Sequence, residues 1–391
     1  MAEAAGFRLG YVYGMRRRDF LTAGLGSLAQ PGAKRKYRAA IIGHTGRGGY
    51  GHEWETAWKG FPSIEVVAVA DPDDAGRGRA MARSGAARGY RDYLEMLRKE
   101  KPDLVGIFPR WLDQRLAMVT AAAEAGAHIL IEKPFAQGLP EADALVAVAE
   151  RHGIKVQVGH TARPTPVTRR AYEMVRAGEI GVLLEMRARG KEDARAGGED
   201  LIVLGTHDFD LMRMFAGDPK WVFAHVTEKG EEVDPRRARQ PTEPVGPVAG
   251  DEVAAMFCFP GGVHGYFGSK ASDQRSGVRF GLTLYGSKGA IFIPLTAVPS
   301  EPPYLLRSPS WVSDSGAAWE RINAPGPKTR ADANAMMVAD LLEAIEKDRD
   351  PVCSARDGRW TIEMVTGIYQ SQLSGARVEF PLKNRSHPLD Y

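Results

Sequence analysis

The most informative stretch of this chain reads Ala125-Gly126-Ala127-His128-Ile129-Leu130-Ile131-Glu132-Lys133-Pro134. It predicts a helix that ends at the glycine and a buried strand from His128 to Ile131, followed directly by Lys133 and the conformationally locked Pro134. In open α/β sheets, ligands bind outside the carboxyl ends of the strands, and a buried lysine there shifts its pKa readily. We therefore interpret Lys133 as a candidate for proton transfer. The alternative is a strand-end lysine in a surface salt bridge with Glu132.

Short apolar strands alternate with helices on both sides of this stretch. Further strands are expected over residues 36–42, 64–70, 104–108 and 155–158, and helices over residues 90–99, 112–125 and 140–152. This alternation is typical of βαβ units, so it predicts an α/β fold with a doubly wound parallel sheet.

The pattern changes after about residue 161. Longer, alternating strands are expected over residues 183–189, 221–227, 253–259, 262–269 and 278–285, joined by turns such as Pro260-Gly261-Gly262 and Gly286-Ser287-Lys288-Gly289. They predict a second, α+β domain with a large open, mainly antiparallel sheet. Residues 228–250 and 298–329 read as long loops that are functional or interaction arms. Helices are expected over residues 166–177, 331–347 and 357–374, the last two packing back on the body.

The composition is that of an ordinary soluble globular protein, with 43% hydrophobic and 26% charged residues among 391. The formal net charge of +3 is too small to indicate nucleic acid or a membrane surface as a partner. Two cysteines, Cys258 and Cys353, provide neither a disulfide framework nor a thiol metal cluster. We therefore expect no metal and a small-molecule partner.

The N-terminus carries Arg16-Arg17-Arg18-Asp19-Phe20-Leu21 before a short apolar stretch. Twin arginines followed by Phe-Leu resemble the signal for twin-arginine export, which would place the protein in the periplasm. The alternative is a disordered basic arm on a cytoplasmic protein. We accordingly divide the chain into an arm or signal (1–35), a nucleotide-binding domain (36–160) and a substrate-binding and oligomerisation domain (161–391).

A glycine-rich motif follows the first expected strand. The pattern Gly43-x-x-Gly46-x-x-Gly49, between a strand and an expected helix, is a variant of the dinucleotide fingerprint, in which the backbone approaches a pyrophosphate at a helix N-terminus. Asp71 ends the second strand at the position that bonds the adenosine ribose, which favours NAD. Arg47, Arg77 and Arg79 are evidence for NADP, and the alternative to the whole reading is a structural glycine turn. The expected cofactor-binding residues are Gly43, Thr45, Gly46, Arg47, Gly48, Gly49, Asp71, Pro109, Glu132 and Lys133.

A second constellation lies in Gly205-Thr206-His207-Asp208-Phe209-Asp210, on a stretch with helical spacing. His207 and Asp210 are three residues apart on one helix face, so the carboxylate could orient the imidazole as a general base. The alternative is a hydrogen-bonded histidine at a helix–sheet interface, with Asp208 and Asp210 as solvated or capping charges.

Together, the glycine loop, Asp71, the Glu-Lys-Pro run and Gly205-x-His207-x-x-Asp210 resemble the glucose–fructose oxidoreductase and inositol dehydrogenase (Gfo/Idh/MocA) family. The resemblance implies a Rossmann domain holding NAD (or NADP), a sugar or polyol substrate over the second domain, and homo-oligomers, dimers or tetramers, built through the open sheet. It assigns Lys133 as the catalytic lysine and His207 as the catalytic histidine. Val203 stands where many family dehydrogenases carry an aspartate, and Phe108-Pro109-Arg110-Trp111 replaces the more usual Thr-Pro-Asn.

The mechanism that this resemblance implies is hydride transfer from a sugar hydroxyl to NAD, with His207 taking the proton and Lys133 bonding the developing alkoxide. Asp210, Glu199 or Asp200 could orient His207 in place of the missing aspartate. Substrate contacts are expected from Arg163, Tyr172, Arg187, Lys191 and Asp210. Two alternatives stay open: an NAD-dependent glycosidase or lyase acting through transient sugar oxidation, and a non-catalytic NAD-binding scaffold or sensor.

Overall fold

The computed structural model describes residues 36–271, 279–296, 298, 301–309 and 316–390. The twin-arginine stretch at residues 16–21 lies outside the described residues. Among the helices that are described, none is both long and apolar enough to cross a membrane.

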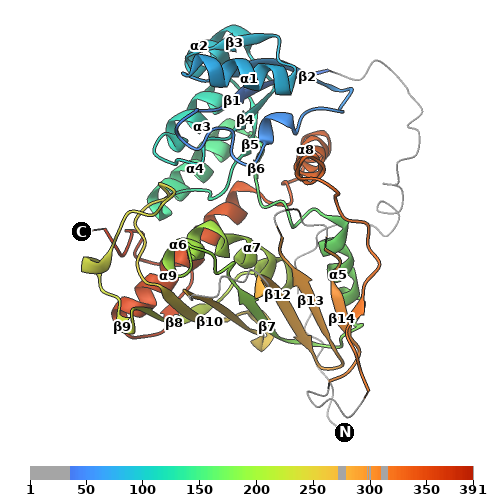
Figure 1. Ribbon diagram of the computed structural model, residues 1–391, viewed down its shortest axis with the longest axis vertical. Coiled ribbons are helices and arrows are strands. Elements are labelled where there is room, and N and C mark those ends of the chain that lie inside the picture. Colours follow the sequence, from blue (N-terminus) through green and yellow to red (C-terminus); the bar gives the residue numbers. More distant parts are fainter. Residues whose placement is uncertain (1–35, 272–278, 297, 299–300, 310–315, 391) are drawn as a thin grey trace. The chain divides into compact units, whose positions relative to one another are not determined.

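Six parallel strands form the first sheet, in the order β3-β2-β1-β4-β5-β6 (Figure 1). The strand order reverses between β1 and β4, which is the switch point where doubly wound sheets bind dinucleotides. The predicted parallel, doubly wound sheet is therefore confirmed. Its strands are β1 (Tyr37–Ile42), β2 (Ile64–Ala70), β3 (Arg88–Tyr90), β4 (Leu104–Ile107), β5 (His128–Ile131) and β6 (Val156–Val158), and its helices are α1 (Asp74–Ser84), α2 (Tyr93–Glu100), α3 (Arg115–Glu124) and α4 (Leu139–His152).

The central strands of this sheet are buried on both faces. All four residues of β4 are buried, as are Ile129 to Ile131 in β5. Continuous apolar runs of this kind suit strands that helices cover on both sides. The burial holds these strands, and therefore their ends, in place. The loops that carry the candidate site begin at these strand ends.

Ten strands form the second sheet, in the order β15-β14-β13-β12-β7-β11-β10-β8-β16 with β9 beside β8. The pair β7 and β11 is parallel and the other pairs are antiparallel, so the predicted mainly antiparallel sheet is confirmed. Its strands are β7 (Leu183–Arg189), β8 (Trp221–Glu228), β9 (Glu231–Glu232), β10 (Glu252–Cys258), β11 (His264–Lys270), β12 (Gly281–Gly286), β13 (Ala290–Pro294), β14 (Tyr304–Leu306), β15 (Glu320–Arg321) and β16 (Val378–Glu379).

Helices α6 (Gly198–Val203), α7 (Gly205–Ala216) and α9 (Ala355–Ser374) pack on one face of this sheet, and α5 (Pro166–Arg176) lies near β13. Both predicted turns form hairpins: the 3₁₀ turn η3 (Pro260–Gly262) joins β10 to β11, and the segment from Gly286 to Gly289 joins β12 to β13. A further 3₁₀ turn, η2 (Pro235–Arg237), lies in the long loop after β9.

The C-terminal helices connect the two sheets. Helix α8 (Arg330–Glu346) packs against β5 and β6, whereas α9 packs against both α4 and β8. Just before α9, the Cys353 carbonyl accepts a hydrogen bond from Val158 N at 2.7 Å, so this segment extends the edge of the first sheet. Because α9 also packs against α7, this hydrogen bond links the first sheet to the helix that carries His207.

The helix expected directly after Gly49 is not formed. The chain makes only a three-residue 3₁₀ turn there, η1 (Trp54–Thr56). Gly48, Gly49, Gly51 and Glu53 all have positive φ, which a right-handed helix excludes. The expectation of a pyrophosphate at a helix N-terminus is therefore wrong for this loop.

Several elements were not predicted from the sequence. Helix α1 contains two glycines and a weak apolar stripe, and β3 is short and largely exposed, so neither gave a periodic signal. The expected irregular stretch at residues 298–329 contains the short strands β14 and β15, of which β15 lies at the edge of the sheet.

Candidate functional site

Lys133 follows β5 and is 5% exposed, and its Nζ donates a hydrogen bond to the Val203 carbonyl oxygen at 3.0 Å. This carbonyl is available because the helix is interrupted after Val203: His207 N donates to Leu204 O, at 3.0 Å, instead of to Val203 O. Burial lowers the pKa of Lys133, although the negative charges of Glu132 and Glu243 oppose that shift. The arrangement holds an amine whose proton is more easily given than that of a surface lysine.

His207 lies one turn after the carbonyl that holds Lys133, at the start of α7, and is partly exposed. Burial lowers the pKa of its imidazole well below the usual value, and the charges of His160 and Lys133 lower it further. Its ring contacts the ring of His160 edge-on, with 5.2 Å between centroids. A neutral, partly accessible imidazole beside a buried amine is suited to act as a general base.

The expected pair between His207 and Asp210 is not formed. Asp210 instead accepts a hydrogen bond at 2.6 Å from Nη1 of Arg163, and the same nitrogen lies 3.5 Å from a carboxylate oxygen of Asp357. A buried guanidinium requires carboxylate partners, and these two satisfy it. Arg163 and Asp210, both expected to contact the sugar, therefore bind each other and fix α7 against the start of α9.

A possible metal group lies beside this pair. Ligand atoms of His160, Asp210 and Cys353, all buried, lie within 4.8 Å of one another. The carboxylate of Asp210 is already paired with the positively charged Arg163. Burial raises the pKa of the Cys353 thiol well above its usual value, so the thiolate that a metal needs is disfavoured. The donor set therefore does not favour a cation.

Glu199 and Asp200 form their hydrogen bonds with residues other than His207. The Glu199 carboxylate accepts hydrogen bonds from Thr242 N, at 3.0 Å, and from Glu243 N, at 3.3 Å. Asp200 accepts from Glu192 N at 3.0 Å and from the Ser269 hydroxyl at 2.6 Å. Both carboxylates anchor loops at the rim of the site.

The glycine loop leaves room for a phosphate at two positions. A Cβ added at Gly46 or Gly49 would meet nothing within 4 Å, whereas one at Gly43 would strike the ring of Tyr50 and one at Gly48 the backbone of Arg110. Open space beside bare backbone is what the close approach of a pyrophosphate needs. Nothing in the loop therefore blocks a ligand at Gly46 and Gly49, although no α-helix follows directly in the described chain, and binding of a pyrophosphate there stays a prediction.

Asp71 is fully buried and holds this loop in place. Its carboxylate accepts hydrogen bonds from Thr45 N, at 3.1 Å, from Thr45 Oγ1, at 2.8 Å, and from Asp73 N, at 3.0 Å. Thr45 and Asp71, both expected to bind the cofactor, thus bind each other. Their direct contact with a ribose stays a prediction.

Arg47 and Glu132 also have partners inside the protein. Arg47 forms an ion pair with Asp113 and lies over the Trp111 ring, with 4.8 Å from Cζ to the centroid. Glu132 is fully buried and bonded to His52 Nδ1, at 2.9 Å, and to the indole N–H of Trp54. Burial raises the pKa of Glu132, but the charges of His52 and Lys133 and the hydrogen bonds from His52 and Trp54 together outweigh burial and hold that pKa at about 2.

A buried arginine that sequence reasoning missed joins the strand ends. Arg115, which is 1% exposed, donates to the carbonyls of Pro109 and Pro134, each at 2.9 Å, and to that of Glu132. Burial lowers its pKa to about 10. The only signal in the sequence was a charged residue at the start of an otherwise apolar helix.

The remaining expected sugar contacts lie apart from one another, in α5, in β7 and in the loop after β7. Tyr172 packs against Phe215 with 5.9 Å between ring centroids, and Lys191 Nζ lies 3.2 Å from a carboxylate oxygen of Asp193. Arg187 alternates along β7 with residues buried toward α7, so it lies on the opposite face of the sheet from His207.

Three charged residues near Lys133 were not predicted as site residues. Glu243 Oε1 accepts hydrogen bonds from Nη1 of Arg195, at 3.0 Å, and from Nη1 of Arg110, at 3.4 Å. The charges of all three act on the Lys133 amine. We refer to Arg110, Glu243 and Arg195 as the arginine clamp. Glu243 lies in the loop of residues 228–250, which the sequence marked only as a functional or interaction arm.

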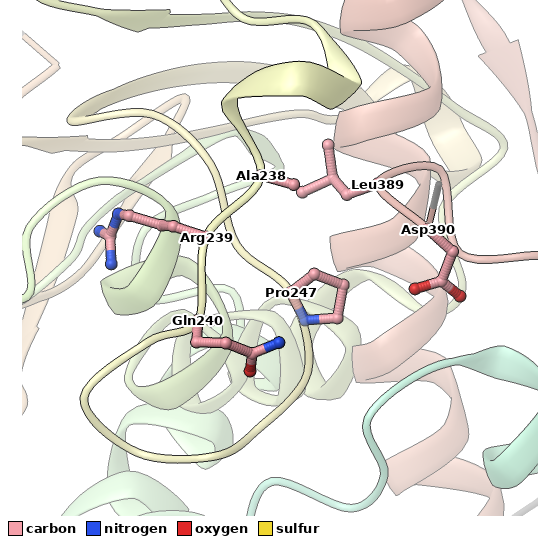
Figure 2. A pocket seen from close by; sticks show the side chains of 6 residues that line it. All are labelled: Ala238, Arg239, Gln240, Pro247, Leu389 and Asp390. Atoms are coloured by element: carbon pink, nitrogen blue, oxygen red, sulfur yellow. The ribbon is translucent and has the colours of Figure 1, made fainter.

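One surface hollow among the described residues does not contain this chemistry. Figure 2 shows it between the 228–250 loop and the C-terminal segment, with a volume of about 310 Å³. Neither Lys133 nor His207 lines it. Its lining residues are Ala238, Arg239, Gln240, Pro247, Leu389 and Asp390.

Comparisons with known proteins agree with this arrangement. A family model described as "Oxidoreductase family, NAD-binding Rossmann fold" matches residues 37–160, and a model of the GFO/IDH/MocA C-terminal domain matches residues 168–292. D-apiose dehydrogenase of Paraburkholderia graminis is 26% identical over 372 residues, which cover 88% of this chain and 90% of that protein. D-xylose 1-dehydrogenase (NADP(+)) 2 of Haloferax volcanii is 30% identical over 177 residues, covering 42% and 53%.

A solved structure shows the same fold. Levoglucosan dehydrogenase in complex with NADH and levoglucosan is 20% identical and superposes with a TM-score of 0.73, covering 89% of this chain and 100% of that chain.

Proposed function

Because the chain belongs to the Gfo/Idh/MocA family of oxidoreductases, we propose that it transfers a hydride between a hydroxyl or carbonyl group of a sugar or polyol and a nicotinamide cofactor. The observation that carries this proposal is the pairing of a lysine at the end of β5 with a neutral histidine one turn beyond the carbonyl that holds it. Residues 36–160 bind the cofactor and residues 161–391 hold the sugar in this proposal.

The residues divide the chemistry as follows. When bound, NAD supplies the hydride acceptor at its nicotinamide ring. His207 accepts the proton of the sugar hydroxyl, and Lys133 donates a hydrogen bond to the oxygen as negative charge develops on it. Arg115 and the Val203 carbonyl keep the lysine in position.

A product analysis tests the proposal. The purified protein is incubated with NAD or NADP and a panel of sugars and polyols, and both NADH or NADPH and the organic product are followed. We expect stoichiometric reduced cofactor and a ketone, lactone or aldehyde, with NAD preferred over NADP. Bond cleavage without net reduced cofactor would assign the chain to the glycosidase or lyase class, and failure to bind either cofactor would refute the proposal.

The pH profile of kcat/KM should be bell-shaped, with both limbs displaced downward. Because burial lowers the pKa of His207, its imidazole stays neutral to a lower pH. The acid limb of the profile therefore lies below the usual histidine value of 6.5. Burial also lowers the pKa of Lys133, so loss of its proton places the alkaline limb below 10.5. Initial rates from pH 4 to pH 10 measure both limbs. An acid limb at or above 6.5 in the wild type would contradict the assignment of His207 as the base.

We further propose that the chain is exported by the twin-arginine route and acts in the periplasm, on the basis of Arg17 and Arg18 in the sequence. Replacing both by Lys should retain the protein in the cytoplasm, as fractionation would show. A wild-type protein found inside the cell with its N-terminus intact would rule this out.

A homo-oligomer is the third part of the proposal. Helices α6, α7 and α9 cover one face of the second sheet, whereas Leu184 and Phe223 are exposed on its strands. Exposed apolar side chains on a broad sheet favour association of two copies. Sedimentation velocity should give a dimer or tetramer that Phe223→Glu weakens. A wild type that sediments as a monomer at micromolar concentration would refute this part.

A further inference from the structure

The arginine clamp joins three loops that are distant in the sequence. Arg110 follows β4, Arg195 precedes α6, and Glu243 lies in the 228–250 loop. The 228–250 loop is held in place from both sides: Glu199 binds its backbone at Glu243 N, and Pro244 O accepts a hydrogen bond at 3.3 Å from the backbone of Leu112. The clamp is therefore a built feature rather than a chance surface contact.

The two arginines differ in how well they are satisfied. Arg195 is held by Asp193 through two hydrogen bonds, Nε to Oδ1 at 3.0 Å and Nη2 to Oδ2 at 2.7 Å, in addition to its bond to Glu243. Arg110 has only the long 3.4 Å contact with Glu243, and its Nε is buried without a hydrogen-bond partner among the described residues. Nε and Nη2 form the fork of the guanidinium, the edge that matches a carboxylate with two parallel hydrogen bonds, and Nε is a buried donor on that edge that no described residue satisfies.

The position of the fork points to the substrate. The backbone of Arg110 packs on Gly48, where an added Cβ would lie 2.6 Å from Arg110 N. Its charge also acts on the Lys133 amine, together with those of Arg195 and Glu243. Arg195 and Glu243 come from loops of the second sheet, which the proposed function assigns to the sugar. The clamp thus lies between the glycine loop and loops of the second sheet, the parts that the proposed function assigns to the cofactor and to the sugar.

We propose that Arg110 binds a carboxylate of the substrate, so that the sugar is an acidic one, of the uronic or aldonic acid class. This inference rests on the proposed function and specifies its substrate. Glu243 is the internal carboxylate that bridges the clamp when no substrate is present, and its long bond to Arg110 yields to the carboxylate of the sugar. Arg195, held by Asp193, keeps Glu243 from leaving the clamp.

The test compares acidic sugars with their neutral counterparts. Calorimetric titration of the NADH-loaded protein uses the pairs D-glucuronate and D-glucose, D-galacturonate and D-galactose, and D-gluconate and D-glucitol. The wild type should bind the acid of at least one pair about tenfold or more tightly than its neutral partner. Arg110→Met should weaken binding of that acid by about 10- to 100-fold, the loss expected for a charge-assisted bidentate contact, and leave the neutral sugar unchanged.

A second variant should act in the opposite direction. Glu243→Gln keeps an acceptor for Arg195 but removes a negative charge beside the fork, so it should tighten binding of the acid several-fold. Arg98→Met, which removes an exposed guanidinium on α2, is the control for net charge and should change the binding of neither sugar.

Three results would overturn the inference. The first is a wild type that binds no acid more tightly than its neutral partner, and the second is an Arg110→Met protein in which binding of the acid and of the neutral sugar is weakened equally. A loss of NADH affinity in Arg110→Met is the third result, and it would assign the fork to the cofactor's pyrophosphate. Failure of the proposed function is distinguishable from all three. In that case the wild type would not bind NADH, or would cleave a sugar without net formation of reduced cofactor. Failure of the carboxylate site alone would leave a protein that binds NADH and oxidises neutral sugars.

Discussion

Lys133→Met and His207→Ala should each lower kcat by about 10²–10⁴-fold, the usual cost of removing a proton-transfer group. Lys133 has one hydrogen-bond partner among the described residues, the Val203 carbonyl, so its remaining N–H bonds can point toward a substrate oxygen. His207 has a lowered pKa, so it is neutral and able to accept a proton at neutral pH. Steady-state kinetics on a confirmed substrate measures the loss.

The fold and the cofactor site should survive both substitutions, because Lys133 gives up only one hydrogen bond among the described residues, to the Val203 carbonyl, and neither side chain holds the glycine loop. Circular dichroism and NADH titration check this. Lys288→Met, in the exposed turn after β12, and His152→Ala, exposed at the end of α4, are the matched controls and should keep wild-type turnover. Turnover close to wild type in His207→Ala would mean that another group takes the proton, and the active-site assignment would be wrong.

The position of Lys133 could be predicted because it depends on local sequence. A run of apolar residues bounded by a glycine and a proline sets the strand, and the sheet then sets where the strand ends. The parallel sheet, its strand ends and the hairpins of the second sheet follow from patterns of this local kind. The prediction of a helix after Gly49 failed for an equally local reason, the run of residues with positive φ. The glycine pattern of the fingerprint motif does not indicate this backbone conformation.

The partners of the charged residues could not be predicted, because they come from distant segments. Asp210 is one turn from His207 in the sequence, yet Arg163, which approaches from the segment after β6, takes its carboxylate. Helical spacing shows which residues share a face, but not what packs against that face. Glu243 is a stronger case, since only the folded loop brings it to Arg110 and Lys133.

Arg115→Met should lower both the stability of the protein and its turnover. The guanidinium donates to three carbonyls, those of Pro109, Glu132 and Pro134, which flank Lys133 and the switch point of the first sheet. Methionine has a similar length but no donor, so these buried carbonyls lose their partner. Leaving a buried polar group unsatisfied costs about 1–3 kcal/mol each, so the free energy of unfolding should fall by several kcal/mol.

Urea denaturation and kcat measured on the same preparation separate the two effects of Arg115. If the residue positions Lys133, kcat should fall even at temperatures where Arg115→Met is fully folded, and the alkaline limb of the pH profile should move, because that limb reports the environment of the lysine. Arg115→Lys keeps the charge but lacks the planar array of donors, so it should restore part of the stability and little of the turnover. Arg98→Met, on the exposed surface of α2, is the matched control and should leave all three quantities unchanged. An Arg115→Met protein with wild-type urea midpoint and an unmoved alkaline limb would show that the strand ends hold their geometry without this arginine, and that the position of Lys133 depends on the Val203 carbonyl alone.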